Sequence, residues 1–156
     1  MKVTIAAVGR LRNGPELALI EDYLDRAKAT GRGMALGPFE ILEIDERKAR
    51  DQAAQSERLR NAIPNGARVF ALDERGRTFT SPTFADMIAR DRDSGVSDLA
   101  FMIGGAAGLD AAARARADHL LSFGPMVWPH MLARVMLAEQ LYRATAILAG
   151  TPYHRE

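Results

Sequence analysis

Five short apolar runs, separated by longer segments with helical spacing, set the pattern of this chain. They cover residues 3–8, 39–44, 68–72, 99–103 and 119–123. The run at 3–8 is apolar at successive positions, which is typical of a strand covered on both faces of a parallel sheet, and the run at 99–103 is an apolar strand as well. The run at 39–44 alternates in part, which indicates one wetter face.

The segments between these runs predict helices. One begins at Pro15, with apolar residues at three- and four-residue spacing; others cover 48–63, a stretch capped by Ser81 with Pro82 first, a short piece after Gly108, and 131–149. We expect residues 73–76 to turn the chain and Gly150 to end the last helix. Strands that alternate with helices indicate βαβ units. The prediction is a single α/β domain over 1–156 with a mostly parallel sheet flanked by helices.

Composition narrows the classes of function. The 156 residues contain no cysteine, which excludes disulfides and thiolate metal sites, and the three histidines lack metal-ligand spacing. We therefore expect no metal and a cytoplasmic location. No apolar run approaches the length of a membrane span. The net charge of +1 argues against general polyanion binding, so any RNA partner requires a local basic patch.

Two loops near the C-terminus are candidates for a binding site. The first, 104–108, is rich in glycine and follows the fourth apolar run; the second, 124–130, contains Met126, Val127 and Trp128. If the two preceding strands are adjacent, the loops meet where open α/β sheets bind ligands. The glycine spacing matches neither a dinucleotide fingerprint nor a P-loop. The second loop suits an apolar slot for a flat heterocycle, packing under the last helix, or a dimer contact.

The last helix and the tail carry polar groups that could act on a nucleotide. Glu139 and Arg143 stand four residues apart, as in an ordinary helix-face ion pair. Tyr153, His154 and Arg155 form either a frayed end or a nucleotide-binding set of an aromatic ring, an imidazole and a guanidinium.

A known family combines these features. The strand and loop Phe101-Met102-Ile103-Gly104-Gly105-x-x-Gly108-Leu109, the segments Pro129-His130-x-x-x-Arg134-Val135 and Glu139-Gln140-Leu141-Tyr142-Arg143-Ala144, and the tail Pro152-Tyr153-His154-Arg155 resemble the RlmH family of SPOUT-class RNA methyltransferases. The resemblance covers essentially the whole chain and is most specific in its C-terminal third.

The resemblance implies a C-terminal trefoil knot, a homodimer, and S-adenosylmethionine bound in the knot. It further implies methylation at N3 of a pseudouridine in 23S rRNA on the assembled ribosome. Carried onto this chain, the cofactor site comprises Leu72, Gly104, Phe123, Gly124, Pro125, Met126, Val127 and Trp128. The chain has Gly124-Pro125 and Trp128 where the family has serine and small polar residues, so we expect backbone groups to make the cofactor contacts there. A valine at Gly104 should then intrude on the cofactor and leave the fold intact.

The implied reaction removes the N3 proton, so a base or proton relay is useful. His154 is the first candidate for the base, with Tyr153 as a stacking partner and Arg143 as a phosphate or carbonyl partner. Arg134, Arg155 and His130 are candidate RNA contacts. Two alternatives stay open: a Rossmann-like oxidoreductase, and a non-catalytic ribosome-associated dimer that has kept the fold.

Overall fold

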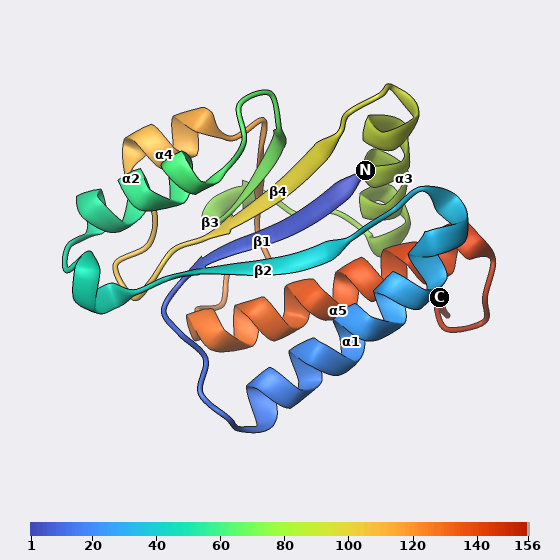
Figure 1. Ribbon diagram of the computed structural model, residues 1–156, viewed down its shortest axis with the longest axis horizontal. Helices are drawn as coiled ribbons and strands as arrows, with labels where there is room; N and C mark the ends of the chain where they lie inside the picture. The colour runs from blue at the N-terminus through green and yellow to red at the C-terminus, as the bar shows by residue number, and fades with distance from the viewer. Residues whose placement is uncertain (156) are drawn as a thin grey trace.

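The computed structural model describes residues 1–155, which form three layers with a parallel sheet in the middle (Figure 1). The sheet has five strands in the order β2-β1-β4-β3-β5, and every neighbouring pair is parallel. The strands are β1 (Lys2–Val8), β2 (Phe39–Ile44), β3 (Arg68–Arg77), β4 (Asp98–Ile103) and β5 (His119–Leu121). The prediction of a parallel α/β sheet is confirmed.

Helices cover both faces of the sheet. One face carries α1 (Pro15–Gly31), α3 (Ser81–Asp93) and α5 (His130–Ala149); the other carries α2 (Gln52–Ala62) and α4 (Ala111–Arg116). Two short 3-10 helices, η1 (Arg32–Met34) and η2 (Glu46–Lys48), lie next to β2. In the described part of the chain, no helix is both long and apolar enough to cross a membrane.

The position of β4 in the middle of the sheet explains why its sequence is apolar at successive positions. Leu99, Phe101 and Ile103 pack into the core under α1, α3 and α5, whereas Ala100 and Met102 pack into the core under α2 and α4. Both faces of the strand are therefore removed from water, as in other parallel sheets covered by helices.

Strand β3 is longer than the sequence indicates. The polar residues 73–76 do not turn the chain but continue the strand to Arg77, after a register shift that pairs Arg77 with Leu121 of β5. A Cβ at Gly76 would lie 2.6 Å from the backbone of Leu120, so glycine permits this close approach. The local polarity gave no sign of a pairing partner that follows more than 40 residues later.

Three further predictions need correction. Strands β4 and β5 are not adjacent, because β3 lies between them. The helix expected over 48–63 begins only at Gln52. Asp51 is its N-cap and accepts a hydrogen bond from Ala54 N. Thr80, and not Ser81, caps α3 by accepting from Thr83 N. Gly150 does end α5, with φ +69°.

Candidate active site

A cavity of about 340 Å³ lies at the carboxyl ends of β3, β4 and β5. Both candidate loops line it even though their strands are not neighbours, because the end of β3 forms the wall between them. The lining includes all of the predicted cofactor residues except Pro125: Leu72, Gly104, Phe123, Gly124, Met126, Val127 and Trp128. His130 and Ala133 border it from the first turn of α5. Its size is that of a small-molecule site.

The glycine loop folds tightly on itself. Gly108 N donates to Gly105 O over 2.9 Å, and a Cβ at Gly104 would lie only 2.7 Å from the carbonyl carbon of Gly108. A valine at Gly104 must therefore distort the loop itself. The expectation that it would only obstruct the cofactor is wrong, because the crowding comes from the loop's own backbone.

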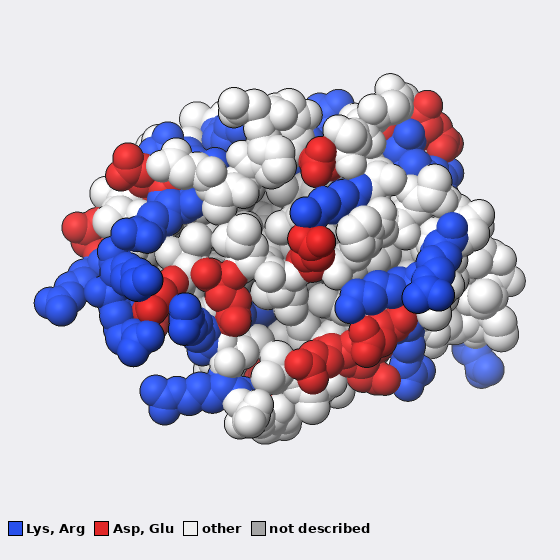
Figure 2. Space-filling model, viewed as in Figure 1, with Lys and Arg blue, Asp and Glu red and all other residues white. Residues whose placement is uncertain are grey.

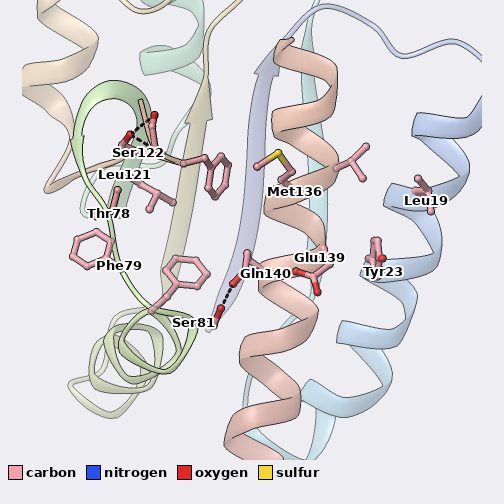
Figure 3. Close-up of a pocket in the computed structure, with 14 residues that line it drawn as sticks. Leu19, Tyr23, Thr78, Phe79, Ser81, Leu121, Ser122, Met136, Glu139 and Gln140 are labelled. Atoms are coloured by element: carbon pink, nitrogen blue, oxygen red, sulfur yellow. Dashed lines mark hydrogen bonds between the residues drawn. The ribbon is translucent and has the colours of Figure 1, made fainter. Parts of the chain in front are cut away.

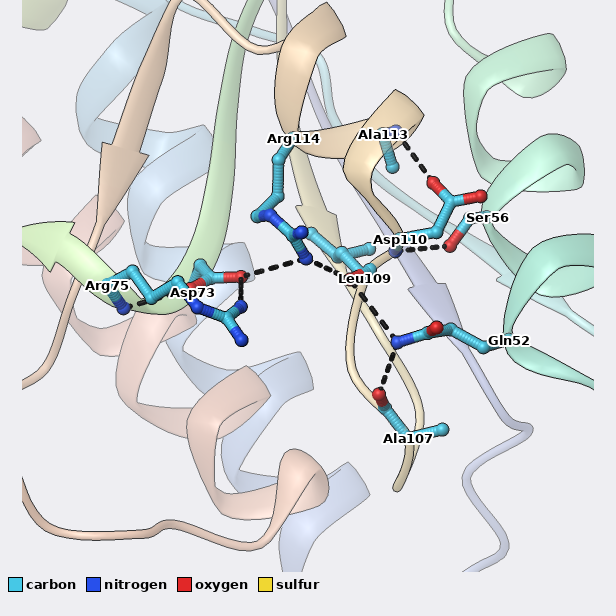
Figure 4. A network of polar contacts seen from close by, with 9 residues as sticks. All are labelled: Gln52, Ser56, Asp73, Arg75, Ala107, Leu109, Asp110, Ala113 and Arg114. Atoms are coloured by element: carbon cyan, nitrogen blue, oxygen red, sulfur yellow. Dashed lines mark hydrogen bonds and ion pairs between the residues drawn. The ribbon is translucent and has the colours of Figure 1, made fainter.

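Two side chains that the sequence did not single out fix the shape of this loop (Figure 4). Gln52, on the first turn of α2, donates from Nε2 to Ala107 O over 2.7 Å and to Leu109 O over 3.4 Å. Arg114, on α4, donates from Nη1 to the same Leu109 carbonyl. No local signal could reveal these contacts, because Gln52 precedes the loop by more than 50 residues.

A carboxylate stands on the cavity wall between two guanidinium groups. Asp73 Oδ1 accepts from Arg75 N over 2.9 Å, while Arg75 Nη1 and Arg114 Nη1 lie 3.5 and 4.0 Å from Asp73 Oδ2. The Asp73 side chain is only 7% exposed. This arrangement places a fixed negative charge beside the glycine loop, where it can accept hydrogen bonds from a ligand.

The candidate catalytic residues assemble on the second half of α5 around Glu139. Tyr153 donates from its hydroxyl to Glu139 Oε1 over 3.0 Å, and Arg143 Nε donates to the same oxygen over 3.0 Å. The Arg143 guanidinium lies 4.8 Å from the centre of the Tyr153 ring, and its Nη1 is 3.3 Å from His154 Nδ1. Tyr153 and His154 are thus fastened to the helix and are not frayed.

Burial and the contacts with Glu139 together shift the pKa values of Tyr153 and Arg143. Burial, reinforced by the hydrogen bond to Glu139, raises the pKa of Tyr153 to about 12, so its hydroxyl stays protonated at neutral pH. The bond to Glu139 likewise raises the pKa of Arg143. Tyr153 is consequently a donor and a stacking surface, and cannot act as a base near neutrality.

The tail does not reach the cavity of its own chain. That cavity borders α5 at His130 and Ala133, and Arg143 lies about 15 Å further along the helix at a rise of about 1.5 Å per residue. In Figure 1 the C-terminus lies at the far end of α5 from its first turn. Arg155 is exposed at this far end.

The Arg134 side chain lies inside the protein and not on its surface. It is fully buried, donating from Nη1 to Glu43 Oε2 over 2.9 Å and from Nη2 to the carbonyls of Val8 and Gly9 over 3.1 Å. Burial lowers the pKa of this guanidinium, and the ion pair with Glu43 opposes that shift. These bonds tie α5 to the ends of β1 and β2, so the prediction that Arg134 contacts RNA directly is wrong.

A second, apolar cavity of about 560 Å³ extends between α1, α3 and α5 (Figure 3). Leu121, Ser122, Phe123 and Gly124 line this cavity as well as the first, so the two lie on either side of that segment. At its other end it reaches Tyr23, Glu139 and Gln140, where Gln140 accepts a hydrogen bond of 2.7 Å from Ser81. The apolar cavity therefore connects the second candidate loop with the residues that hold the tail.

Comparisons with known proteins agree with this architecture. A family model described as "Predicted SPOUT methyltransferase" matches residues 1–154. A protein from Dinoroseobacter shibae named ribosomal RNA large subunit methyltransferase H is 65% identical over 155 residues, covering 99% of both chains. A protein of the same name from Paracoccus denitrificans is 55% identical over 156 residues, covering 100% of both.

Solved structures share the fold at low sequence identity. A probable methyltransferase from Bordetella pertussis has a TM-score of 0.53 at 16% identity, covering 92% of this chain and 94% of its own. A probable methylase family protein from Haemophilus influenzae has a TM-score of 0.51 at 12% identity, covering 99% of this chain and 70% of its own. Together with the family model and the close relatives, the paired loops at the sheet edge show that the chain belongs to the SPOUT methyltransferase family.

Proposed function

We propose that this protein uses S-adenosylmethionine to methylate N3 of a pseudouridine in 23S rRNA, with the assembled ribosome as substrate and the cytoplasm as location. The observation that carries the proposal is the convergence of the glycine loop and the apolar loop on one cavity of cofactor size. The names of the close relatives, which refer to large-subunit ribosomal RNA, support the choice of substrate.

The residues around the cavity suit S-adenosylmethionine chemically. Backbone groups of the exposed stretch 106–108 and of the loop after β5 can pair with the edge of a flat purine. Leu72 and Trp128 offer apolar surface to its faces, and the Asp73 carboxylate can accept hydrogen bonds from hydroxyl or ammonium groups. The same cavity thus contains both classes of group that the cofactor requires.

When bound, the cofactor supplies an electrophilic methyl group, and its transfer to N3 releases one proton that a base must accept. His154 is the proposed base. The Arg143 guanidinium can only donate, so Nδ1 is the accepting nitrogen in their 3.3 Å contact; this contact holds the ring, and Arg143 must leave Nδ1 before that nitrogen can take the N3 proton. Tyr153 presents its ring for stacking while its hydroxyl donates to Glu139. Arg143 and Arg155 provide positive charge for phosphate or carbonyl oxygens, and His130 lies at the edge of the cavity for a further RNA contact.

We further propose a homodimer in which the tail of one protomer completes the cavity of the other. Val127 is 88% exposed and Met126 71% exposed, and Trp128, Met131 and Leu132 extend this apolar surface onto α5. A second chain would remove it from water. Because the tail lies far from its own cavity, association is the arrangement that brings His154 to a bound cofactor.

Mass spectrometry of rRNA nucleosides, from cells with and without this gene, tests the function. We expect N3-methylpseudouridine to disappear from 23S rRNA when the gene is deleted and to return with the wild-type gene. Unchanged rRNA would contradict the proposal. Calorimetry with S-adenosylmethionine on the purified protein separates an enzyme from a non-catalytic dimer, which would bind no cofactor, and titration with NADH tests the oxidoreductase alternative.

A further inference from the structure

Basic side chains gather at the end of the molecule formed by η2 and the start of α2, on the face shown in Figure 2. The loop after β1 contributes Arg10 and Arg12, and the segment after β2 contributes Arg47, Lys48 and Arg50. All five are exposed, and we call this group the basic rim. Both segments follow the carboxyl ends of parallel strands, so the basic rim lies at the same edge of the sheet as the cofactor cavity.

The acidic residues near the basic rim are largely committed to contacts within the protein. Glu43 Oε2 accepts from Leu11 N over 2.7 Å and also pairs with buried Arg134. Asp51 caps α2 through Ala54 N. Asp45 pairs with Arg47 at 2.9 Å and lies 4.0 Å from Arg10. Glu46 of η2 is exposed and forms no ion pair within residues 1–155, so the five cations of this surface face one carboxylate that is not committed to such a contact.

The five cations differ in their ion pairs. Within residues 1–155, no ion pair involves Arg12, Lys48 or Arg50. The net charge of the whole chain is only +1, so this concentration of unpaired positive charge is a local feature. Such a surface attracts a polyanion by releasing its counterions.

The basic rim is joined to the candidate active site through the end of β1. A Cβ built on Gly9 would lie 3.3 Å from Glu46 Oε1 of η2 and 3.8 Å from His130 Nε2. His130 in turn borders the cofactor cavity. The loop with Arg10 and Arg12 is also fastened, since Leu11 N donates to Glu43. A nucleic-acid strand that enters the cavity from this side therefore passes the loop that carries Arg10 and Arg12.

We propose that the basic rim docks the phosphate backbone of the rRNA segment that flanks the target nucleotide. The proposal rests on the proposed function and adds a surface to it: the rim holds the RNA, while the two loops hold the cofactor. Contacts with phosphates carry no sequence information but fix register and orientation. Substitution within the rim should accordingly weaken ribosome binding and leave cofactor binding alone.

The test compares two double variants with the same change in charge. Lys48→Ala/Arg50→Ala removes two unpaired cations of the basic rim; Arg32→Ala/Arg90→Ala removes two exposed arginines from segments that lead into the opposite, amino edge of the sheet. Methyl transfer to ribosomes from cells lacking the enzyme gives kcat and KM, sedimentation with ribosomes at several salt concentrations gives binding, and calorimetry gives the cofactor Kd.

For the rim variant we expect a KM for ribosomes raised about tenfold, with kcat and the cofactor Kd unchanged. The slope of log affinity against log salt concentration should fall in magnitude by about 2, roughly 1 for each lost phosphate contact. Wild-type affinity and salt slope in the rim variant, or an equal loss in the control pair, would overturn the proposal. Because sedimentation needs no turnover, docking is judged even if the wild-type protein fails to methylate ribosomes, which would contradict only the proposed function.

Discussion

Single side chains distant in sequence set the shape of the cofactor loop. Gln52 donates to the carbonyls of Ala107 and Leu109, and Arg114 donates to that of Leu109. Asp110, the next residue, is fixed in turn by Ser56 Oγ at 3.0 Å. The cavity edge is thus shaped by α2 and α4 before any ligand binds, and such preorganisation lowers the free-energy cost of binding.

Replacing Gln52 by glutamate should expose this contribution. The substitution keeps the shape of the side chain but removes its donor, so the carbonyl of Ala107 loses its partner. A hydrogen bond contributes about 1 kcal/mol net, and we expect S-adenosylmethionine affinity to fall about five- to tenfold. Calorimetry measures the affinity for S-adenosylmethionine. We expect kcat at saturating cofactor to be unchanged. Asn61→Asp, at an exposed position of the same helix, is the matched control; equal affinities in both variants would contradict the role of Gln52.

At the scale of elements, α5 serves two sites that lie far apart along its length. Its first turn borders the cofactor cavity, Arg134 ties it to β1 and β2, and its second half holds the tail through Glu139. Tyr142 adds to this hold, since its ring centre lies 4.4 Å from that of Tyr153. The tail is therefore a positioned element that can act on a substrate brought to it.

Deletion of residues 153–156 should leave dimerisation and cofactor binding nearly intact but reduce methyl transfer to ribosomes by at least about a hundredfold. That magnitude is typical for the loss of a positioned acid–base group. Single-turnover assays and calorimetry check the two halves of the expectation. Arg155→Ala removes the exposed guanidinium proposed to contact RNA but keeps Tyr153 and His154, so it separates the two contributions and should lose far less activity than the deletion. Full turnover by the truncated protein would mean that the tail has no catalytic role.

At the scale of the whole molecule, one chain exposes an apolar surface next to an apolar cavity. The exposed apolar residues from Met126 to Leu132 and the cavity between α1, α3 and α5 adjoin each other through the loop after β5. We expect a second copy of the chain to cover this surface, in an interface that buries at least about 1,000 Å². Light scattering should therefore report a dimer at micromolar concentration. A stable monomer at that concentration would contradict the proposed homodimer.

Mixed dimers should show whether the tail acts on the partner's cavity. One protomer carries the 153–156 deletion; the other carries Gly104→Val, whose distorted loop cannot bind cofactor. Each homodimer should be inactive, whereas the heterodimer combines an intact tail with an intact cavity and should regain activity at one of its two sites. Calorimetry must first confirm that Gly104→Val gives a folded dimer without cofactor binding. A heterodimer as inactive as its parents would contradict action between protomers.

The sequence alone determined the features that depend on local pattern. Apolar runs predicted the strands of a parallel sheet, and glycine and proline marked helix ends. The two loops were predicted to form one site because their composition is unlike that of ordinary turns, and both line the same cavity. The resemblance to a known family, which covers the whole chain, then supplied the activity. The trefoil knot that it implies stays a prediction.

Only the tertiary structure decided which distant segments meet. It placed β3 between β4 and β5, moved Arg134 from the surface into the core, and showed that Gly104 is confined by Gly108. It also revealed Gln52 as a partner of the glycine loop. Each of these facts depends on a contact between separate segments or on the exact path of a loop. Periodicity and local propensity depend only on residues that are close in the sequence. They therefore carry no information about which distant segments pack against each other.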